Sequence, residues 1–214
     1  RHYCAAPAGI KEIRFAGQTA LFGTKLLFRC ESMPEFTLAV EICEDLWAPL
    51  PPSTAHALAG ATVIANLSAS DETVGKAEYR EALVSQQSAR LLCAYLYADA
   101  GHGESTTDMV FSGHNLIAEN GALLSESRPF ESGYACTELD LGRLLSERCR
   151  NTSFEPVTDG YEIIPFSLPV KEVPLTRHFS PTPFVPADDT ARAERCELIL
   201  RMQSDGLAKR MEHA

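Results

Sequence analysis

Basic residues and long apolar runs are both scarce in this sequence. Its 19 Lys and Arg are outnumbered by 29 Asp and Glu, which gives a net charge of −10. Binding to nucleic acid or to an anionic membrane surface requires a basic patch, so this balance argues against both partners. No stretch approaches the roughly 20 apolar residues of a membrane-spanning helix, and no apolar run follows a basic start, as in a signal peptide. We therefore expect no membrane partner.

Paired cysteines and an initiator methionine are also missing. The seven cysteines are an odd number and include no Cys-x-x-Cys pair. We therefore expect neither a disulfide framework nor a metal site, and we place the chain in a reducing cytoplasm. The chain opens on Arg1, which we interpret as a cut point within a longer protein. With 45% hydrophobic residues, it is able to bury a core of one domain and a fraction.

Residues 37–98 alternate between short apolar runs and helical segments. Ser53 is the expected N-cap of the first helix, and the second run is almost wholly apolar, as in a strand buried on both faces. The alternation predicts an α/β fold. In chain order it consists of a strand at Thr37–Ile42, a helix at Ser53–Ala59, a strand at Ala61–Leu67, a helix at Lys76–Leu92 and a strand at Cys93–Ala98.

Elsewhere the signals are more local. Asn120-Gly121 between apolar runs predicts a β-hairpin, because both turn positions need a positive φ. Two apolar runs around Phe22-Gly23 predict a strand, a turn and a second strand within Thr19–Glu31. A strand at Ala135–Leu139 and a helix at Leu141–Arg150 are expected next, whereas Asn151–Val173 is weakly patterned.

A proline-rich segment at 180–186 divides the chain. Such segments form semi-rigid linkers, so we predict one domain over residues 1–179 and a second region over residues 180–214. The second region is expected to be a helix that Asp188, Asp189 or Thr190 caps.

Cys43 is the main candidate for chemistry, because it stands where a buried strand meets a polar turn. A thiol in this position is held by a rigid element and is able to reach a cleft. The alternative is that Cys43 is an ordinary core residue, since cysteine is among the most buried residue types. A nucleophile also needs a base, and His56, on a short predicted helix, is interpreted as solvated and a poor partner.

Two polar segments follow the next strands. Asn66–Ser70 ends the second strand, and Gly101–Asp108 follows the third. Ligands of parallel α/β sheets bind beyond the carboxyl ends of the strands, so Ser70 and Cys43 are expected to line one cleft with the Gly103–Asp108 loop. Ordinary turn chemistry explains the Asn and Ser residues equally well, and the acidic residues of the loop are explained equally well by solvation.

The motifs in their order resemble a known family. Glu41–Trp47 is similar to the nucleophile segment of the carbon–nitrogen hydrolase (nitrilase) superfamily, and Pro51-Pro52-Ser53 continues the likeness. Asn66–Ser70, Val74–Arg80 and Gly103–Asp108 narrow the resemblance to the glutaminase domain of glutamine-dependent NAD synthetases. Residues 207–211 are similar to the stretch before the pyrophosphate loop of that family.

The resemblance implies part of an α-β-β-α sandwich with a Glu–Lys–Cys triad. Cys43 would be the nucleophile that attacks glutamine, and the backbone N–H of Glu44 an oxyanion donor. Glu44, Ser70 and Lys76 would bind the glutamine head group. The released ammonia would serve a synthetase domain, where ATP and magnesium support amidation of nicotinic acid adenine dinucleotide.

The resemblance also implies what these residues do not contain. The triad Glu and Lys belong upstream of Cys43, and Arg1-His2-Tyr3 resembles the end of the stretch that follows the Lys. The ATP site belongs beyond Ala214, so no cofactor is expected here. We predict a homo-oligomer that needs the rest of its own chain. A stand-alone amidase of the same superfamily and a non-catalytic assembly module are the alternatives.

Overall fold

The computed structural model describes residues 9–157, 159–172 and 174–214. Contacts divide the chain into two compact units, Arg1–Pro174 and Leu175–Ala214. The division of function at residue 180 stays a prediction. The interpretation of Arg1-His2-Tyr3 concerns residues outside the described part of the chain.

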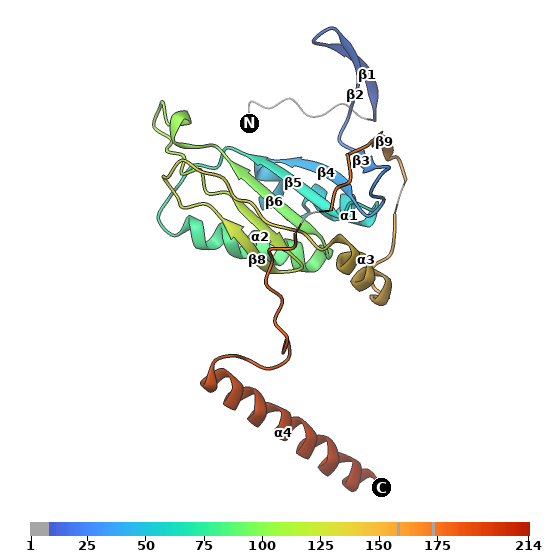
Figure 1. Cartoon of the computed structure of the whole chain (residues 1–214), viewed down its shortest axis with the longest axis vertical. Coiled ribbons are helices and arrows are strands. Elements are labelled where there is room, and N and C mark those ends of the chain that lie inside the picture. The colour runs from blue at the N-terminus through green and yellow to red at the C-terminus, as the bar shows by residue number, and fades with distance from the viewer. Residues whose placement is uncertain (1–8, 158, 173) are drawn as a thin grey trace. The chain divides into compact units, whose positions relative to one another are not determined.

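Most strands of the first unit join one mixed sheet (Figure 1). Within the described residues its order is β8-β7-β6-β5-β4-β3-β9. The three central strands β4, β5 and β6 are parallel, whereas β3 and β7 run antiparallel to their central neighbours. The strands are β3 (Leu26–Cys30), β4 (Thr37–Ile42), β5 (Val63–Ser68), β6 (Ala94–Asp99), β7 (Leu116–Glu119), β8 (Ala122–Glu126) and β9 (Glu162–Phe166).

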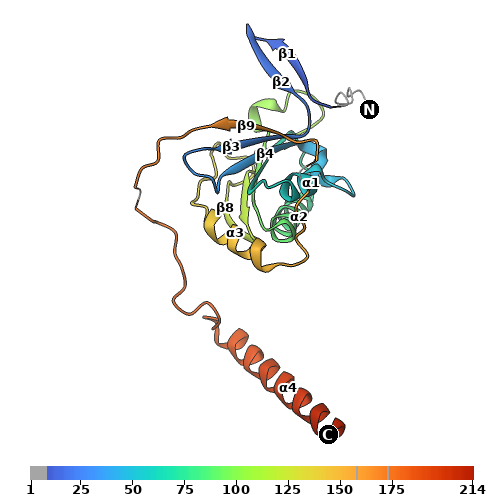
Figure 2. The same ribbon diagram turned by 90° about the vertical axis from the view of Figure 1, so that its right-hand side faces the viewer.

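Helices α1 (Pro52–Leu58) and α2 (Lys76–Leu91) pack on one face of this sheet (Figure 2). Ala57 of α1 and Val84 of α2 share a core with Ile64 and Tyr95 of the strands. The α/β class is confirmed, and a sheet with these helices on one face is what half of an α-β-β-α sandwich contains.

The opposite face of the sheet is partly open. Side chains alternate along a strand, so Ile42 and Leu67 lie on the face away from α1 and α2. Their exposed fractions are 63% and 55%. These apolar side chains at the centre of a sheet have the pattern of strands that a second layer covers.

Helix α3 (Leu141–Arg150) lies where predicted and is anchored by Arg148. The guanidinium is buried, and it donates to the carbonyls of Ala61 (2.7 Å), Leu91 (3.1 Å) and Leu92 (3.0 Å). Arg148 also stacks over the Phe154 ring at 4.7 Å. It thus satisfies carbonyls at the carboxyl end of α2, which have no partner within their own helix.

Replacing Arg148 with Met is expected to destabilise the protein. The apolar stem is kept, but buried carbonyls lose a charged donor, so the free energy of unfolding should fall by about 3 kcal/mol. Urea denaturation of both proteins measures the difference. Arg150→Met is the matched control, because Arg150 is an exposed residue of the same helix. Equal losses in the two variants would contradict the anchoring role.

Two hairpins have left-handed turn residues. The predicted turn between β7 and β8 is confirmed, with φ of 47° at Asn120 and 87° at Gly121. A second hairpin joins β1 (Lys11–Phe15) to β2 (Gln18–Phe22) in a separate sheet. The strand, turn and second strand predicted within Thr19–Glu31 are present as β2 and β3, although β2 pairs with β1 and β3 belongs to the large sheet.

Two local predictions were wrong. Residues 135–139 belong to no strand. The weakly patterned segment, for which no element was predicted, contains β9, which pairs in parallel with β3. Ser53 is not the N-cap of α1, because Pro51 takes that position and Pro52 begins the helix. The side chain of Ser53 is buried instead, where it accepts a hydrogen bond from Gln87.

The second unit contains the helix α4 (Asp189–His213). Of the three predicted caps the structure uses Asp188, whose carboxylate accepts from the backbone N–H of Ala191 at 2.8 Å. No residue of helix α4 is buried. Across the described part of the chain, no helix has both the length and the apolar character that membrane crossing would demand.

Candidate active site

The candidate residues gather at one edge of the sheet. Because β4, β5 and β6 are neighbouring and parallel, their carboxyl ends lie side by side. Cys43 follows β4, Ser70 follows β5, and Asp99 ends β6. This is the edge at which ligands of parallel sheets bind. The single cleft expected for these residues and the Gly103–Asp108 loop stays a prediction.

Cys43 occupies a strained turn between β4 and the 3₁₀ helix η1 (Cys43–Trp47). Its φ is +51°, a left-handed conformation that costs a non-glycine residue roughly 1–3 kcal/mol and persists only where the surroundings impose it. The residue is half-buried. Among the described residues its Sγ takes part in no hydrogen bond.

A buried asparagine imposes the conformation of Cys43. The Cys43 N–H donates to Oδ1 of Asn66 at 3.1 Å, and Nδ2 of Asn66 donates to the Cys43 carbonyl at 3.2 Å. Asn66 is fully buried on β5. The same Nδ2 also donates to Oη of Tyr95 at 3.2 Å. One side chain thus holds both polar backbone groups of Cys43.

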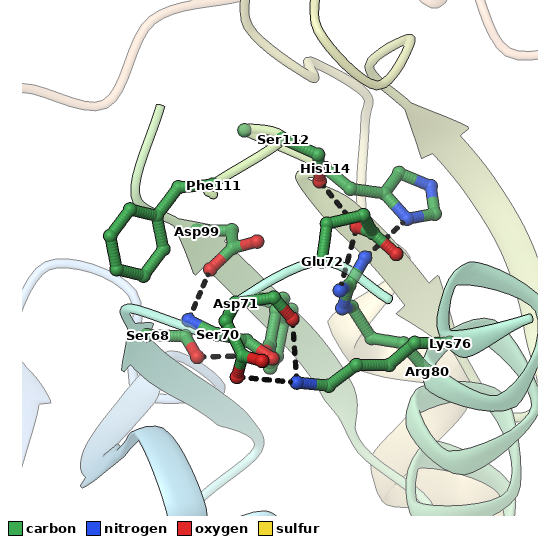
Figure 3. Close-up of polar contacts among 12 residues, drawn as sticks. Ser68, Ser70, Asp71, Glu72, Lys76, Arg80, Asp99, Phe111, Ser112 and His114 are labelled. Atoms are coloured by element: carbon green, nitrogen blue, oxygen red, sulfur yellow. Dashed lines mark hydrogen bonds and ion pairs between the residues drawn. The ribbon is translucent and has the colours of Figure 1, made fainter. Parts of the chain in front are cut away.

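Ser70 is fixed from the end of the neighbouring strand (Figure 3). Its backbone N–H donates to Oδ1 of Asp99 at 2.8 Å, and the residue is only 5% exposed. Burial raises the pKa of Asp99 above its usual range. Asp99 was not singled out from the sequence, although a carboxylate at the end of a predicted buried strand is a signal for this edge.

Lys76, at the first turn of α2, points back toward the same loop (Figure 3). Its Nζ donates to the Asp71 carbonyl at 2.6 Å and to Oδ1 of Asp71 at 2.9 Å. It also lies 5.6 Å from the ring centroid of Trp47, in η1 beside Cys43. The hydrogen bond from Lys76 holds the pKa of Asp71 below its usual range. Lys76 therefore connects the Ser70 loop with the Cys43 turn.

A buried ion pair supports the Ser70 loop from behind. Arg80 is fully buried and donates to Oε2 of Glu72 at 2.9 Å, while its Nη1 lies 2.9 Å from Nδ1 of His114 (Figure 3). Ser112 donates to the same Glu72 oxygen. Burial alone would raise the pKa of Glu72, but the hydrogen bonds from Ser112 and Arg80 outweigh it and the pKa is lowered. This cluster was not found from the sequence.

The loops that follow β5 and β6 contact each other. The backbone N–H of Glu72 donates to the carbonyl of Val110 at 2.7 Å, and Asp71 forms a β-bridge with Phe111. Phe111 in turn donates to Oγ of Ser105 at 2.9 Å. Residues 71–72 after β5 and residues 110–111 after β6 therefore lie side by side.

Glu44 is exposed in the first turn of η1, next to Cys43. The assignments of Cys43, Glu44, Ser70 and Lys76 to the reaction stay predictions. The interpretation of His56 as solvated was wrong. His56 is 3% exposed, its Nδ1 lies 2.8 Å from Oη of Tyr161, and burial lowers its pKa. It is a core residue of α1.

Within residues 9–214, apart from 158 and 173, no three His, Cys, Asp or Glu side chains are grouped so as to hold a metal ion. The six cysteines in the described residues are free, and Cys136, Cys149 and Cys196 are exposed.

Comparisons with known proteins give close relatives. A glutamine-dependent NAD(+) synthetase of Mycobacterium tuberculosis is 44% identical over 210 residues, which cover 93% of this chain. The corresponding enzyme of Mycobacterium leprae is 42% identical over 214 residues. The chain is homologous to glutamine-dependent NAD(+) synthetases. It spans about 31% of the length of these relatives, and no protein-family model matches it.

Solved structures similar to the chain carry the same name or belong to the nitrilase superfamily. A glutamine-dependent NAD(+) synthetase from Cytophaga hutchinsonii is 28% identical with a TM-score of 0.49, over 59% of this chain and 20% of that one. Saccharomyces cerevisiae Nit3, a nitrilase-superfamily member, is 20% identical with a TM-score of 0.47, over 54% and 42% of the two chains.

Proposed function

We propose that this chain forms the nucleophile-bearing half of a glutaminase that supplies ammonia to an NAD synthetase. The observation that carries the proposal is the placement of Cys43. It is held in a left-handed conformation at the carboxyl end of the parallel central strands, in a chain 44% identical to an enzyme named for glutamine and NAD. A strained, half-buried thiol at that edge fits a nucleophile better than a core cysteine.

The reaction proposed for Cys43 is attack of its thiolate on the carboxamide carbon of glutamine. The C–S bond forms first and gives a tetrahedral oxyanion. The C–N bond then breaks as the leaving nitrogen takes a proton and departs as ammonia. Water then adds to the thioester, which releases glutamate and returns a proton to sulfur. The carboxylate and lysine that move protons and stabilise the oxyanion would come from residues outside these 214, as the resemblance implies.

The head group of glutamine would bind among Glu44, Ser70 and Lys76. Lys76 offers a cation for the α-carboxylate beside the Cys43 turn, and Asp71 keeps that cation in place through a 2.9 Å ion pair. The buried backbone of Ser70, which Asp99 fixes by a hydrogen bond, would form a rigid side of the glutamine site. Preorganised contacts of this kind hold the amide carbon near the thiol.

Ammonia would then be used to amidate nicotinic acid adenine dinucleotide. ATP and magnesium would act in a synthetase region outside these residues. A cytoplasmic location and a homo-oligomeric state stay predictions from the sequence.

The test uses the full-length enzyme that contains this chain. Glutamine labelled with ¹⁵N in its amide is supplied with nicotinic acid adenine dinucleotide, ATP and magnesium, and the NAD product is examined by mass spectrometry. We expect the label in the carboxamide of NAD. Glutamine hydrolysis without transfer would favour a stand-alone amidase, and absence of hydrolysis would favour an assembly module.

A further inference from the structure

We propose that Asn66 is a positioning residue for the nucleophile, which it holds in its attacking conformation through the backbone of Cys43. The inference rests on the proposed function, because it assigns Asn66 a part in the same reaction. It also goes beyond that function, since Asn66 acts on Cys43 rather than on glutamine.

Asn66 forms hydrogen bonds with both polar backbone groups of Cys43. Its Oδ1 accepts from the Cys43 N–H at 3.1 Å and its Nδ2 donates to the Cys43 carbonyl at 3.2 Å. The ladder between β4 and β5 ends at Ile42, so the backbone groups of Cys43 are not paired within it. Unpaired, they would draw the turn toward another conformation.

Asn66 is itself fixed. Its Nδ2 donates to Tyr95, and the Tyr95 hydroxyl donates to the buried carboxylate of Glu41. Glu41 lies two residues before Cys43 on β4. The same pair of side chains, Asn66 and Tyr95, therefore holds the end of the strand and the turn that follows it.

The network reaches both helices on that face. Oε2 of Glu41 accepts from the backbone N–H of Ser53 in α1 at 2.8 Å. The Ser53 hydroxyl accepts from Gln87 of α2 at 2.9 Å. Asn66, Glu41 and Tyr95 are all at most 2% exposed. The nucleophile turn is thus connected to packed helices by buried polar side chains, whose mutual support makes them rigid.

The test compares Asn66→Leu with the unaltered full-length enzyme. Leucine is close to asparagine in shape but makes none of these hydrogen bonds. Displacement of a reacting group by about 1 Å costs about 10²-fold in rate, so kcat for glutamine hydrolysis should fall by about 10²-fold. KM for glutamine should change little, because Asn66 does not contact the substrate. Ammonia-driven NAD synthesis should be retained, which also reports that the protein is folded.

Two further variants complete the test. Ser68→Ala is the matched control, because Ser68 lies on the same strand and face and its hydroxyl pairs with Oη of Tyr97 at 2.6 Å, so the change leaves the hydrogen bonds of Asn66 in place. It should retain kcat. Tyr95→Phe keeps the ring but frees the amide of Asn66, so we expect a smaller fall in kcat, and it replaces Asn66→Leu if that variant does not fold.

The outcomes separate the two proposals. If Cys43→Ala abolishes glutamine hydrolysis while Asn66→Leu and Tyr95→Phe behave like Ser68→Ala, the positioning role is wrong and the nucleophile stands. A rise in KM with kcat unchanged would also overturn the positioning role and would place Asn66 in substrate binding. If Cys43→Ala leaves hydrolysis intact, the proposed function itself fails.

Discussion

Replacing Cys43 with alanine in the full-length enzyme is expected to abolish glutamine-driven NAD synthesis and to leave ammonia-driven synthesis unchanged. Without the thiol no thioester forms, and loss of a catalytic nucleophile lowers rates by on the order of 10⁴- to 10⁶-fold. Free ammonia bypasses this step, because amidation would take place at a separate site. Steady-state assays with glutamine or ammonium chloride as the only nitrogen donor measure the two activities.

Cys149→Ala is the matched control for this experiment. Cys149 is a free, exposed cysteine on α3, so its loss should affect neither activity. Loss of both activities in a folded Cys43→Ala protein would mean that Cys43 is a structural residue. Its strained φ would then reflect packing at the end of β4 rather than chemistry.

The second expected result is that the 214 residues alone hydrolyse glutamine no faster than background. The Sγ of Cys43 has no hydrogen-bonded base in the described part of the chain, and His56 is held in the core by Tyr161. General acid–base catalysis contributes about 10²–10⁴-fold and oxyanion donors about 10²–10³-fold. If the carboxylate and lysine of the triad lie outside these residues, as the resemblance implies, the rate should fall by at least about 10⁴-fold.

Glutamate release from the purified chain, measured beside its Cys43→Ala variant and the full-length enzyme, gives the answer. Turnover that depends on Cys43 would show that a residue within these 214 acts as the base.

We also expect the chain to self-associate, since Ile42 and Leu67 expose apolar side chains on the central strands of the sheet. Light scattering on the same sample measures the association.

The local sequence pattern was sufficient to predict the central strands of the sheet and the helices α2 and α3. The boundaries of β4 and α3 were predicted to the residue, and β5, α2 and β6 to within one or two. Each of these elements has an apolar run or an apolar period that its own residues define, so its conformation depends on neighbours in sequence. The Asn120-Gly121 turn belongs to the same class, because its two residues tolerate the φ that the turn requires.

Pairings between strands that lie far apart in the chain could not be predicted from local sequence patterns. β9 joins β3 across more than 130 residues, and nothing in its own five residues indicates a parallel partner at the sheet edge. Ser53 shows the same effect at a single position. Its residue type is typical of an N-cap, yet Glu41 and Gln87 engage it in the core, and Pro51 takes the cap instead.

The sequence by itself determined which residues could act. The sequence pattern predicted Cys43 at the end of a buried strand, and Ser70 and Lys76 after the next strand. These predictions were possible because the ends of strands and the starts of helices depend on the local amino-acid composition. Only the tertiary structure decided how the thiol is held. Asn66, Tyr95 and Glu41 come from three strands, and their side chains meet only because those strands lie side by side with their inward faces in register. A hydrogen bond depends on distance and angle in space, and separation along the chain specifies neither.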